Sequence, residues 1–225
     1  MELFEVMRTT FAARDYTSDP LPDEVLQEMF ENARFAPSGG NRQGARVIVV
    51  RDQGTKDRLA DLAEPAGKRY MAQAAAGEGP WNPLAPPGVS DATIAKTQVP
   101  ARLTETFREA PVVLVFAVDL KVVAATDQLL DRVGMISGAS IYPLIWNVLM
   151  AARQAGFGGT ITTLAVAQEP ALKELLGVPD DFAIAAVVPL GKPVKQLTKL
   201  KREAVEDFVV RERFDGEAFL TPPAG

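Results

Sequence analysis

The chain has 225 residues, of which 47% are hydrophobic, and it carries a formal net charge of −5 with no cysteine and no histidine. A chain of this length can form one domain with a full core, and its acidic balance argues against general nucleic-acid binding, because phosphate backbones attract basic surfaces. The two missing residue types exclude disulfides, thiolate chemistry, Ser-His triads and the usual transition-metal ligands, so a bound cofactor is the natural carrier of difficult chemistry and no metal site is expected.

The ends and the apolar runs of the chain give no targeting signal. Residues 1–5 are acidic and lack a signal-peptide pattern. The longest apolar candidate, residues 134–152, is broken by polar residues and by Pro143, so it does not predict a transmembrane helix. We therefore expect a cytoplasmic protein that has no membrane partner.

The first third of the chain alternates between helical and extended patterns. Leu3, Phe4, Met7 and Phe11 predict a short amphipathic helix. A second helix is predicted to begin after residues 20–23, to carry apolar side chains from Val25 to Ala33, and to end at Pro37. Residues 46–50 are β-branched and predict a strand, and residues 52–62 return to helical spacing.

Residues 64–102 differ in character, because they are rich in alanine, glycine and proline. One interpretation is a variable excursion over the surface. The other is a lid over a ligand site, since long loops within compact domains are often functional. In a lid, Trp81 would be the residue of most use for contacting a substrate.

The second half of the chain contains the two most apolar segments. Residues 111–118 and 182–190 predict buried strands. Between them, residues 126–152 predict a long helix that Pro143 should kink, the glycines of 156–159 end it, and residues 169–176 predict a short helix. The tail, 203–225, has apolar residues but no core of its own, so we expect it to lie against something, which in a homodimer can be the partner subunit.

These strands do not alternate regularly with crossover helices. The mixture therefore favours an α+β protein over a doubly wound sheet, and we expect one domain over residues 1–225, built as a three-layer α-β-α sandwich with helices on both faces.

Residues 33–43 form the most informative motif, Ala33-Arg34-Phe35-Ala36-Pro37-Ser38-Gly39-Gly40-Asn41-Arg42-Gln43. Taken alone, it is either a helix stop or a turn whose amides can lie against a planar, polar ligand. Directly before a β-branched strand, it resembles the signature Ala-Arg-x-Ala-Pro-Ser-x-x-Asn-x-Gln of the FMN-dependent nitroreductase family. The resemblance implies a mainly antiparallel central sheet, a homodimer with FMN at the subunit interface, and cofactor contacts from Pro37, Ser38, Gly39, Asn41 and Gln43.

The N-terminal segment departs from the family in part. The family typically has Arg-Arg-Ser-x-Arg before an aromatic residue, and here Thr10, Phe11 and Ala12 stand where Arg, Arg and Ser are usual. Arg14 is retained, and the resemblance places it near the N1 edge of the flavin, where a cation stabilises the reduced ring. The resemblance places Thr10, Phe11 and Ala12 at the FMN phosphate, which the missing basic residues hold in the family. Arg8 is either a substitute ligand for that phosphate or a solvated surface residue.

Two further segments resemble the family. Residues 149–164 resemble its Ala-Ala-Arg-x-x-Gly-Leu-Gly segment, which implies that Ile161, Thr162, Thr163 and Leu164 run under the flavin and that one of their backbone N–H groups faces N5. Without the resemblance, the glycines are a helix C-cap. The basic run of residues 195–202 taken alone is a solvated surface segment, whereas the resemblance implies that Lys199, Lys201 or Arg202 holds the FMN phosphate.

The resemblance also implies an activity. NADH or NADPH would deliver hydride to flavin N5, and a small-molecule oxidant such as a nitroaromatic or a quinone would then take its place in a ping-pong reaction. Two kinds of alternative stay open. One is ene reduction or reductive dehalogenation on the same fold, and the other is a flavin-binding protein for storage with little turnover.

Overall fold

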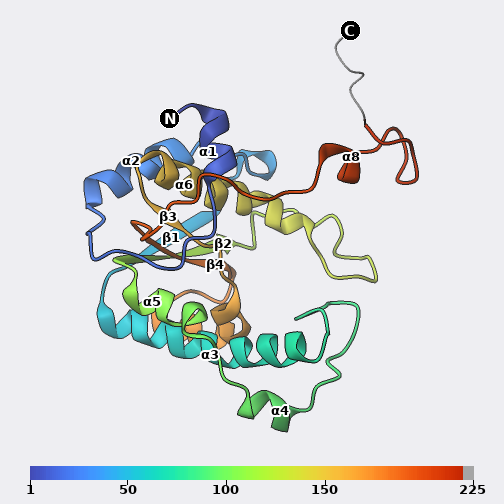
Figure 1. Ribbon diagram of the computed structural model, residues 1–225, viewed down its shortest axis with the longest axis horizontal. Helices are drawn as coiled ribbons and strands as arrows, with labels where there is room; N and C mark the ends of the chain where they lie inside the picture. Colours follow the sequence, from blue (N-terminus) through green and yellow to red (C-terminus); the bar gives the residue numbers. More distant parts are fainter. Residues whose placement is uncertain (220–225) are drawn as a thin grey trace.

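The computed structural model describes residues 1–219 and has three layers, a central sheet with helices above and below it (Figure 1). The sheet is antiparallel, with the strand order β1-β2-β4-β3. Its strands are β1 (Ala45–Val50), β2 (Val112–Asp119), β3 (Gly158–Gly159) and β4 (Phe182–Gly191). The three-layer α+β sandwich with an antiparallel sheet is therefore confirmed.

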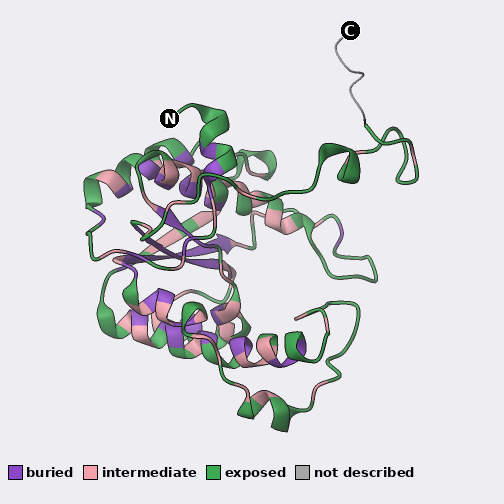
Figure 2. Ribbon diagram, in the orientation of Figure 1, coloured by how far each residue is buried: buried purple, intermediate pink, exposed green. Residues whose placement is uncertain are grey.

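Strand β2 lies at the centre because it is apolar on both faces. Leu114 and Phe116 pack into the core under one helical layer, and Val113 and Val115 pack into the core under the other. Side chains alternate between the two faces of a strand, so a strand covered on both sides is a continuous apolar run. This is why the two most apolar segments of the sequence become the two inner strands, as Figure 2 shows by their burial.

Each face of the sheet has its own set of helices. On one face lie α1 (Leu3–Thr9), α2 (Asp23–Ala33) and α6 (Tyr142–Gln154). On the other lie α3 (Gln53–Ala75), α5 (Glu105–Glu109) and α7 (Glu169–Leu176), with α4 (Asp91–Lys96) packed beyond α3. Short 3-10 turns occupy residues 39–41, 101–103, 136–140 and 164–168, and α8 (Val205–Phe208) lies in the tail.

The prediction that the third helix ends at residue 62 is wrong, because α3 continues to Ala75 and includes Pro65. Its inner face contains several small buried residues, among them Ala60, Ala63 and Ala66. These residues give a weak helical pattern in the sequence but allow close packing against neighbouring elements. That packing outweighs the roughly 3 kcal/mol that an internal proline costs a helix.

The prediction of one long helix over residues 126–152 is also wrong. Residues 120–135 form an irregular segment, and α6 begins only at Tyr142, with Pro143 in its first turn, where its missing N–H costs nothing. The buried carboxylate of Asp127 holds the irregular segment by accepting the Met135 N–H at 2.7 Å and a bond from Arg132 Nη1 at 2.9 Å. Pro143 therefore starts the helix and does not kink it.

Apolar side chains remain exposed at the two ends of the described chain. Helix α1 forms where it is predicted, without Phe11, but Leu3, Phe4 and Met7 are 63%, 67% and 49% exposed, so its apolar face does not meet the core of its own chain. The tail runs away from the body of the molecule (Figure 1), and residues 220–225 of the predicted tail lie outside the described part. None of the helices among residues 1–219 combines the length and apolar character that a membrane crossing requires.

Candidate functional site

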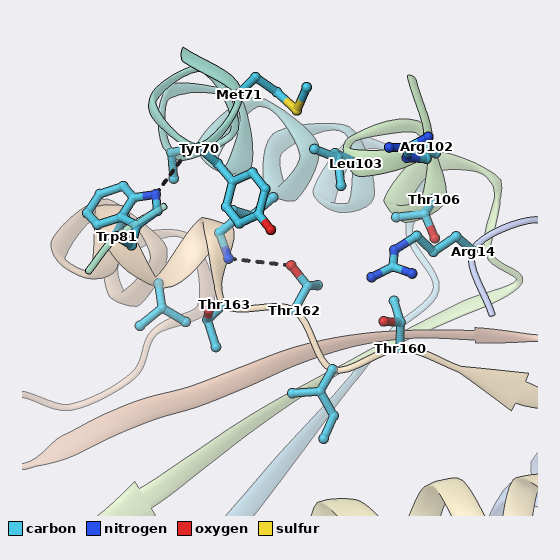
Figure 3. Close-up of a pocket in the computed structure, with 15 residues that line it drawn as sticks. Arg14, Tyr70, Met71, Trp81, Arg102, Leu103, Thr106, Thr160, Thr162 and Thr163 are labelled. Carbon is cyan, nitrogen blue, oxygen red and sulfur yellow. Dashed lines mark hydrogen bonds between the residues drawn. The ribbon is translucent and has the colours of Figure 1, made fainter. Parts of the chain in front are cut away.

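A cavity of about 800 Å³ lies between the helical layer of α3 and the segment that follows β3 (Figure 3). It brings together segments that are far apart in the sequence: the N-terminal segment, the end of α3, the excursion before α5, and residues 160–167. Its lining residues are Arg14, Ala66, Tyr70, Met71, Trp81, Arg102, Leu103, Thr106, Thr160, Ile161, Thr162, Thr163, Leu164, Val166 and Ala167.

Residues 160–164 form one wall of the cavity because they extend the edge of the sheet. The Thr162 N–H donates to Val187 O at 3.0 Å, and the Val187 N–H donates back to Thr162 O at 2.9 Å. The Thr162 amide is therefore committed to the sheet, and the Leu164 N–H is aimed at Thr162 Oγ1 at 3.4 Å. Within the described chain, the amides of Ile161 and Thr163 have no protein acceptor, so these two are the donors left for a ligand.

Arg14 reaches the cavity from a strand-like segment that is fixed on both sides. The Ala13 N–H donates to Gly159 O at 3.0 Å, and the Tyr16 hydroxyl lies 2.8 Å from Ala13 O and 2.9 Å from Pro189 O. Burial raises the pKa of Tyr16, so this anchor stays protonated at neutral pH. The backbone that carries the Arg14 guanidinium is thus held rigidly beside β3.

Trp81 is held at the other end of the cavity by α3. Its backbone N–H donates to Gln73 Oε1 at 3.0 Å, and its indole N–H donates to Ala66 O at 3.3 Å. Gln73 is buried and also donates to Glu78 Oε2 at 3.0 Å, while the Arg69 guanidinium stacks 3.9 Å from the Trp81 ring. Trp81 has a φ of 55°, which is unusual for a bulky residue, so this network fixes a strained backbone.

Two basic side chains and no acidic ones line the cavity, counting the residues that the structure describes. Arg14 and Arg102 lie toward the same end in Figure 3, and neither forms an ion pair within residues 1–219. Thr106 lies near them, and its buried hydroxyl has no well-formed hydrogen bond. The hydroxyl is still close enough to Tyr16 to lower the pKa of Tyr16, against the larger effect of burial. This end of the cavity is therefore electropositive in a protein of negative net charge.

The turn at 36–43 does not line this cavity. It is mostly exposed and packs against the segment before α6, with the Gly39 N–H 3.2 Å from Ser140 Oγ and Arg42 Nη1 3.4 Å from Val122 O. Gly40, Asn41 and Gln43 all have φ between 52° and 60°, so the turn is held in a left-handed backbone. Ser38 contributes to this by accepting the Gln43 N–H at 3.0 Å.

The residues expected at the phosphate end also lie outside the cavity. Thr10 is buried and donates to Val6 O, and Arg8 is exposed in the last turn of α1. Arg153 Nε donates to Thr9 Oγ1 at 2.9 Å, and Gln196 Nε2 donates to Thr9 O at 3.0 Å. The second bond ties the start of the basic run to the end of α1. The remaining members of this set are Phe11 and Ala12, which precede Arg14, and Lys199, Lys201 and Arg202, which are exposed in an irregular segment.

The structure thus brings together one part of the predicted site, namely Arg14, Trp81 and Ile161–Leu164. It leaves Pro37–Gln43 and the candidates for the phosphate on other surfaces of the same chain. Sequence reasoning missed Tyr70, Met71, Arg102 and Thr106, because their place in the cavity depends on how residues 64–106 fold over it. An arginine beside a predicted lid is the one signal that could have pointed to Arg102.

A model of the nitroreductase family matches residues 7–192 of the chain. The chain is similar to curated proteins that are named for different activities. Iodotyrosine deiodinase 1 of Mus musculus is 24% identical over 93% of this chain and 69% of its own length. An NADH dehydrogenase of Thermus thermophilus is 32% identical over 81% of this chain and 82% of its own. A nitrobenzene nitroreductase of Ectopseudomonas oleovorans is 24% identical over 91% and 94%.

Solved structures show the same fold at lower identity. Oxidized iodotyrosine deiodinase bound to FMN and 3-iodo-L-tyrosine has a TM-score of 0.65 and 18% identity, and the match covers 94% of this chain and 99% of that one. The NADPH:FMN oxidoreductase of Vibrio harveyi complexed with NAD+ also has a TM-score of 0.65 and 18% identity, over 94% and 77%.

Proposed function

Because the chain belongs to the nitroreductase family, we propose that it is an FMN-dependent oxidoreductase. In this proposal it takes electrons from NADH or NADPH and passes them to nitroaromatics, quinones or similar electron-poor compounds. The observation that carries the proposal is the cavity itself, which joins Arg14 to the segment 161–164 although these are far apart in the sequence. Relatives named as an NADH dehydrogenase and a nitrobenzene nitroreductase support the reaction class.

The residues of the cavity fit a flavin in size and in chemistry. A volume of about 800 Å³ falls in the usual range for cofactor pockets. The free amides of Ile161 and Thr163 are donors for ring acceptors on one wall, and the guanidinium of Arg14 suits the ring edge on which negative charge collects. When bound, FMN supplies the hydride chemistry, and the protein's part is to orient the ring, place a cation at its edge and exclude water.

We further propose a homodimer whose partner copy supplies the 36–43 turn to the site. Three observations support this. The turn holds a strained conformation although it is exposed, the apolar face of α1 is uncovered, and the tail carries exposed Phe208 and Phe214 away from its own body. A two-fold dimer would cover such surfaces in both copies at once. In this arrangement Ser38, Asn41 and Gln43 would face a cavity of the other subunit.

Reductive dehalogenation is the second candidate. It is favoured by the iodotyrosine deiodinase relatives and by the matching structure with FMN and 3-iodo-L-tyrosine. The two reactions would use the same cofactor and the same walls of the cavity, and they differ in the bond that breaks in the oxidant. Product analysis with a nitroaromatic and with an iodophenol separates them.

The proposal is tested with the purified protein after reconstitution with FMN. We expect a yellow protein whose visible absorbance bleaches under anaerobic NADH or NADPH and returns when a nitroaromatic or a quinone is added. A protein that takes up no FMN would refute the proposal. A flavin that binds but that neither nicotinamide reduces would instead support a storage role.

A further inference from the structure

The cavity has more positive charge than a flavin edge alone explains. It contains Arg14 and Arg102, and no acidic residue of the described chain lines it. The chain as a whole has a net charge of −5, so two unpaired arginines in one cavity are a local reversal of sign. An unpaired cation in a cavity with apolar walls attracts an anion more strongly than it would on an open surface.

The two arginines are held by different parts of the fold. Arg14 is half-buried in the segment fixed against β3, as expected of a residue that contacts a resident cofactor. Arg102 is exposed and sits in the 3-10 turn 101–103, at the end of the excursion that carries Trp81. Because Arg102 is exposed, its guanidinium is open to a ligand that exchanges with solvent.

The rest of the outer wall is aromatic and apolar. Tyr70, Met71, Trp81 and Leu103 line it, and the Arg69 guanidinium already covers one face of the Trp81 ring at 3.9 Å. The uncovered face of the Trp81 ring and the ring of Tyr70 offer a stacking surface for a planar ligand. The network through Gln73 fixes Trp81, so this surface is formed before a ligand binds.

We propose that Arg102 binds an anionic substituent of the oxidant, so that the cavity prefers planar aromatic substrates that carry a carboxylate. The planar guanidinium matches a carboxylate in a two-point contact, and the aromatic body of the substrate extends from there along Leu103 toward Tyr70. This inference rests on the proposed function, because it assigns the substrate class of the same site. It gives Arg102 a substrate-binding role and leaves Arg14 to the cofactor.

Equilibrium binding tests this inference without turnover. The probes are 4-nitrobenzoate and its neutral isostere 4-nitrobenzamide, titrated into the oxidised, FMN-loaded protein. We expect the wild type to bind the benzoate about tenfold more tightly, the usual scale of one partly exposed charge-assisted contact. Arg102→Gln should remove this preference and leave the affinity for the benzamide unchanged, while Arg102→Lys should keep part of it.

A matched control removes the same charge elsewhere. Arg58 is exposed on α3 and does not line the cavity, so Arg58→Gln should keep the full preference. Equal affinity of the wild type for the two probes would overturn the inference. A loss in Arg102→Gln that is equal for both probes, or a shift of the flavin midpoint potential in that variant, would also overturn it, because either result assigns Arg102 to the cofactor.

The inference and the proposed function fail in different ways. If the protein binds the benzoate preferentially through Arg102 but reduces no oxidant with either nicotinamide, the inference on ligand class is upheld and the reductase proposal is refuted. If it reduces nitroaromatics without any preference between the two probes, the reductase proposal is upheld and the inference is refuted.

Discussion

The cavity behind Trp81 and the turn at 36–43 are the two regions that carry the expected cofactor contacts, and they are built in opposite ways. The cavity is walled by a sheet edge, a helix and a polar network, all within one chain. The turn is strained and exposed, and within the described chain it is supported by its own Ser38 and by the segment before α6. The comparison indicates that one chain by itself forms the wall that contains Arg14 and residues 161–164. In the proposed dimer, the turn would supply the second wall to the cavity of the partner copy.

We expect the greatest change from breaking the interface of the proposed dimer. Substituting Leu3, Phe4 and Met7 together by lysine should convert the dimer to a monomer, because burying three such side chains contributes roughly 5 kcal/mol or more. These residues are exposed in the single chain, so the monomer should keep its fold. Sedimentation equilibrium measures the dimer, and circular dichroism checks the fold. A variant that stays dimeric would place the interface elsewhere.

The next prediction tests whether the network through Gln73 fixes Trp81 within a single chain. Gln73→Leu leaves the Trp81 N–H and the Glu78 carboxylate without their buried partner, which should cost about 1–3 kcal/mol of unfolding free energy. Trp81 should also become more mobile. Fluorescence anisotropy in a Trp146→Phe background reports on Trp81 alone, since the chain has two tryptophans. Unchanged anisotropy would mean that other contacts hold Trp81.

A smaller effect concerns Arg14, which we propose to lie beside the cofactor. Arg14→Ala should destabilise reduced FMN relative to oxidised FMN and lower the midpoint potential by roughly 30 mV, which corresponds to ~1.4 kcal/mol for two electrons. The reason is the loss of a fixed positive charge at the ring edge. Spectroelectrochemical titration measures the potential, with Arg58→Gln as the control. A potential that does not fall would remove Arg14 from its assigned role.

The smallest change concerns residues 120–135, which belong to the segment that the 36–43 turn packs against. Hydrogen bonds to the Asp127 carboxylate, chiefly from the Met135 N–H, lower the pKa of Asp127. The stabilisation is therefore present above the ordinary pKa of aspartate and is lost as the pH falls through the lower folded-state value. Limited proteolysis of residues 120–135 should accelerate over that acidic range and, in Asp127→Asn, should be faster already at neutral pH. A neutral-pH rate equal to the wild type would show that Asp127 does not hold the segment.

The sequence predicted those parts of the fold whose signals are local. The inner strands are continuous apolar runs, and Gly177 ends α7 in a left-handed conformation, as expected of a C-terminal glycine. The second half of α3 was missed because its buried residues are small or polar, namely Ala66, Gly67, Ala72 and Gln73, and because Pro65 argues against a helix. The start of α6 was misplaced because the bonds of Asp127 to Met135 and Arg132 are invisible in a periodicity pattern.

The site was predictable to the extent that a motif or a resemblance marks its residues. Arg14 and Ile161–Leu164 were assigned by resemblance and share one cavity, while the roles given to them stay predictions. Tyr70 and Arg102 were missed, because their contribution depends on the path of the excursion and on no local pattern. The Thr162 amide bonds to Val187, so within the described chain the amides of Ile161 and Thr163 are the free donors. Only the pairing at the edge of the sheet reveals this.

The most direct test of a site shared between two copies is a mixed dimer. One copy carries Arg14→Glu in the cavity, and the other carries Ser38→Asp with Asn41→Asp in the turn, each chosen to abolish FMN binding when both copies of a dimer carry it. Mixed dimers are isolated with two affinity tags, and bound FMN is counted by absorbance. If the turn acts on the partner's cavity, one site has no substitution, so the mixed dimer should bind about one FMN, half of the wild-type amount. A mixed dimer that binds none would contradict this account, because each site would then lie within one chain.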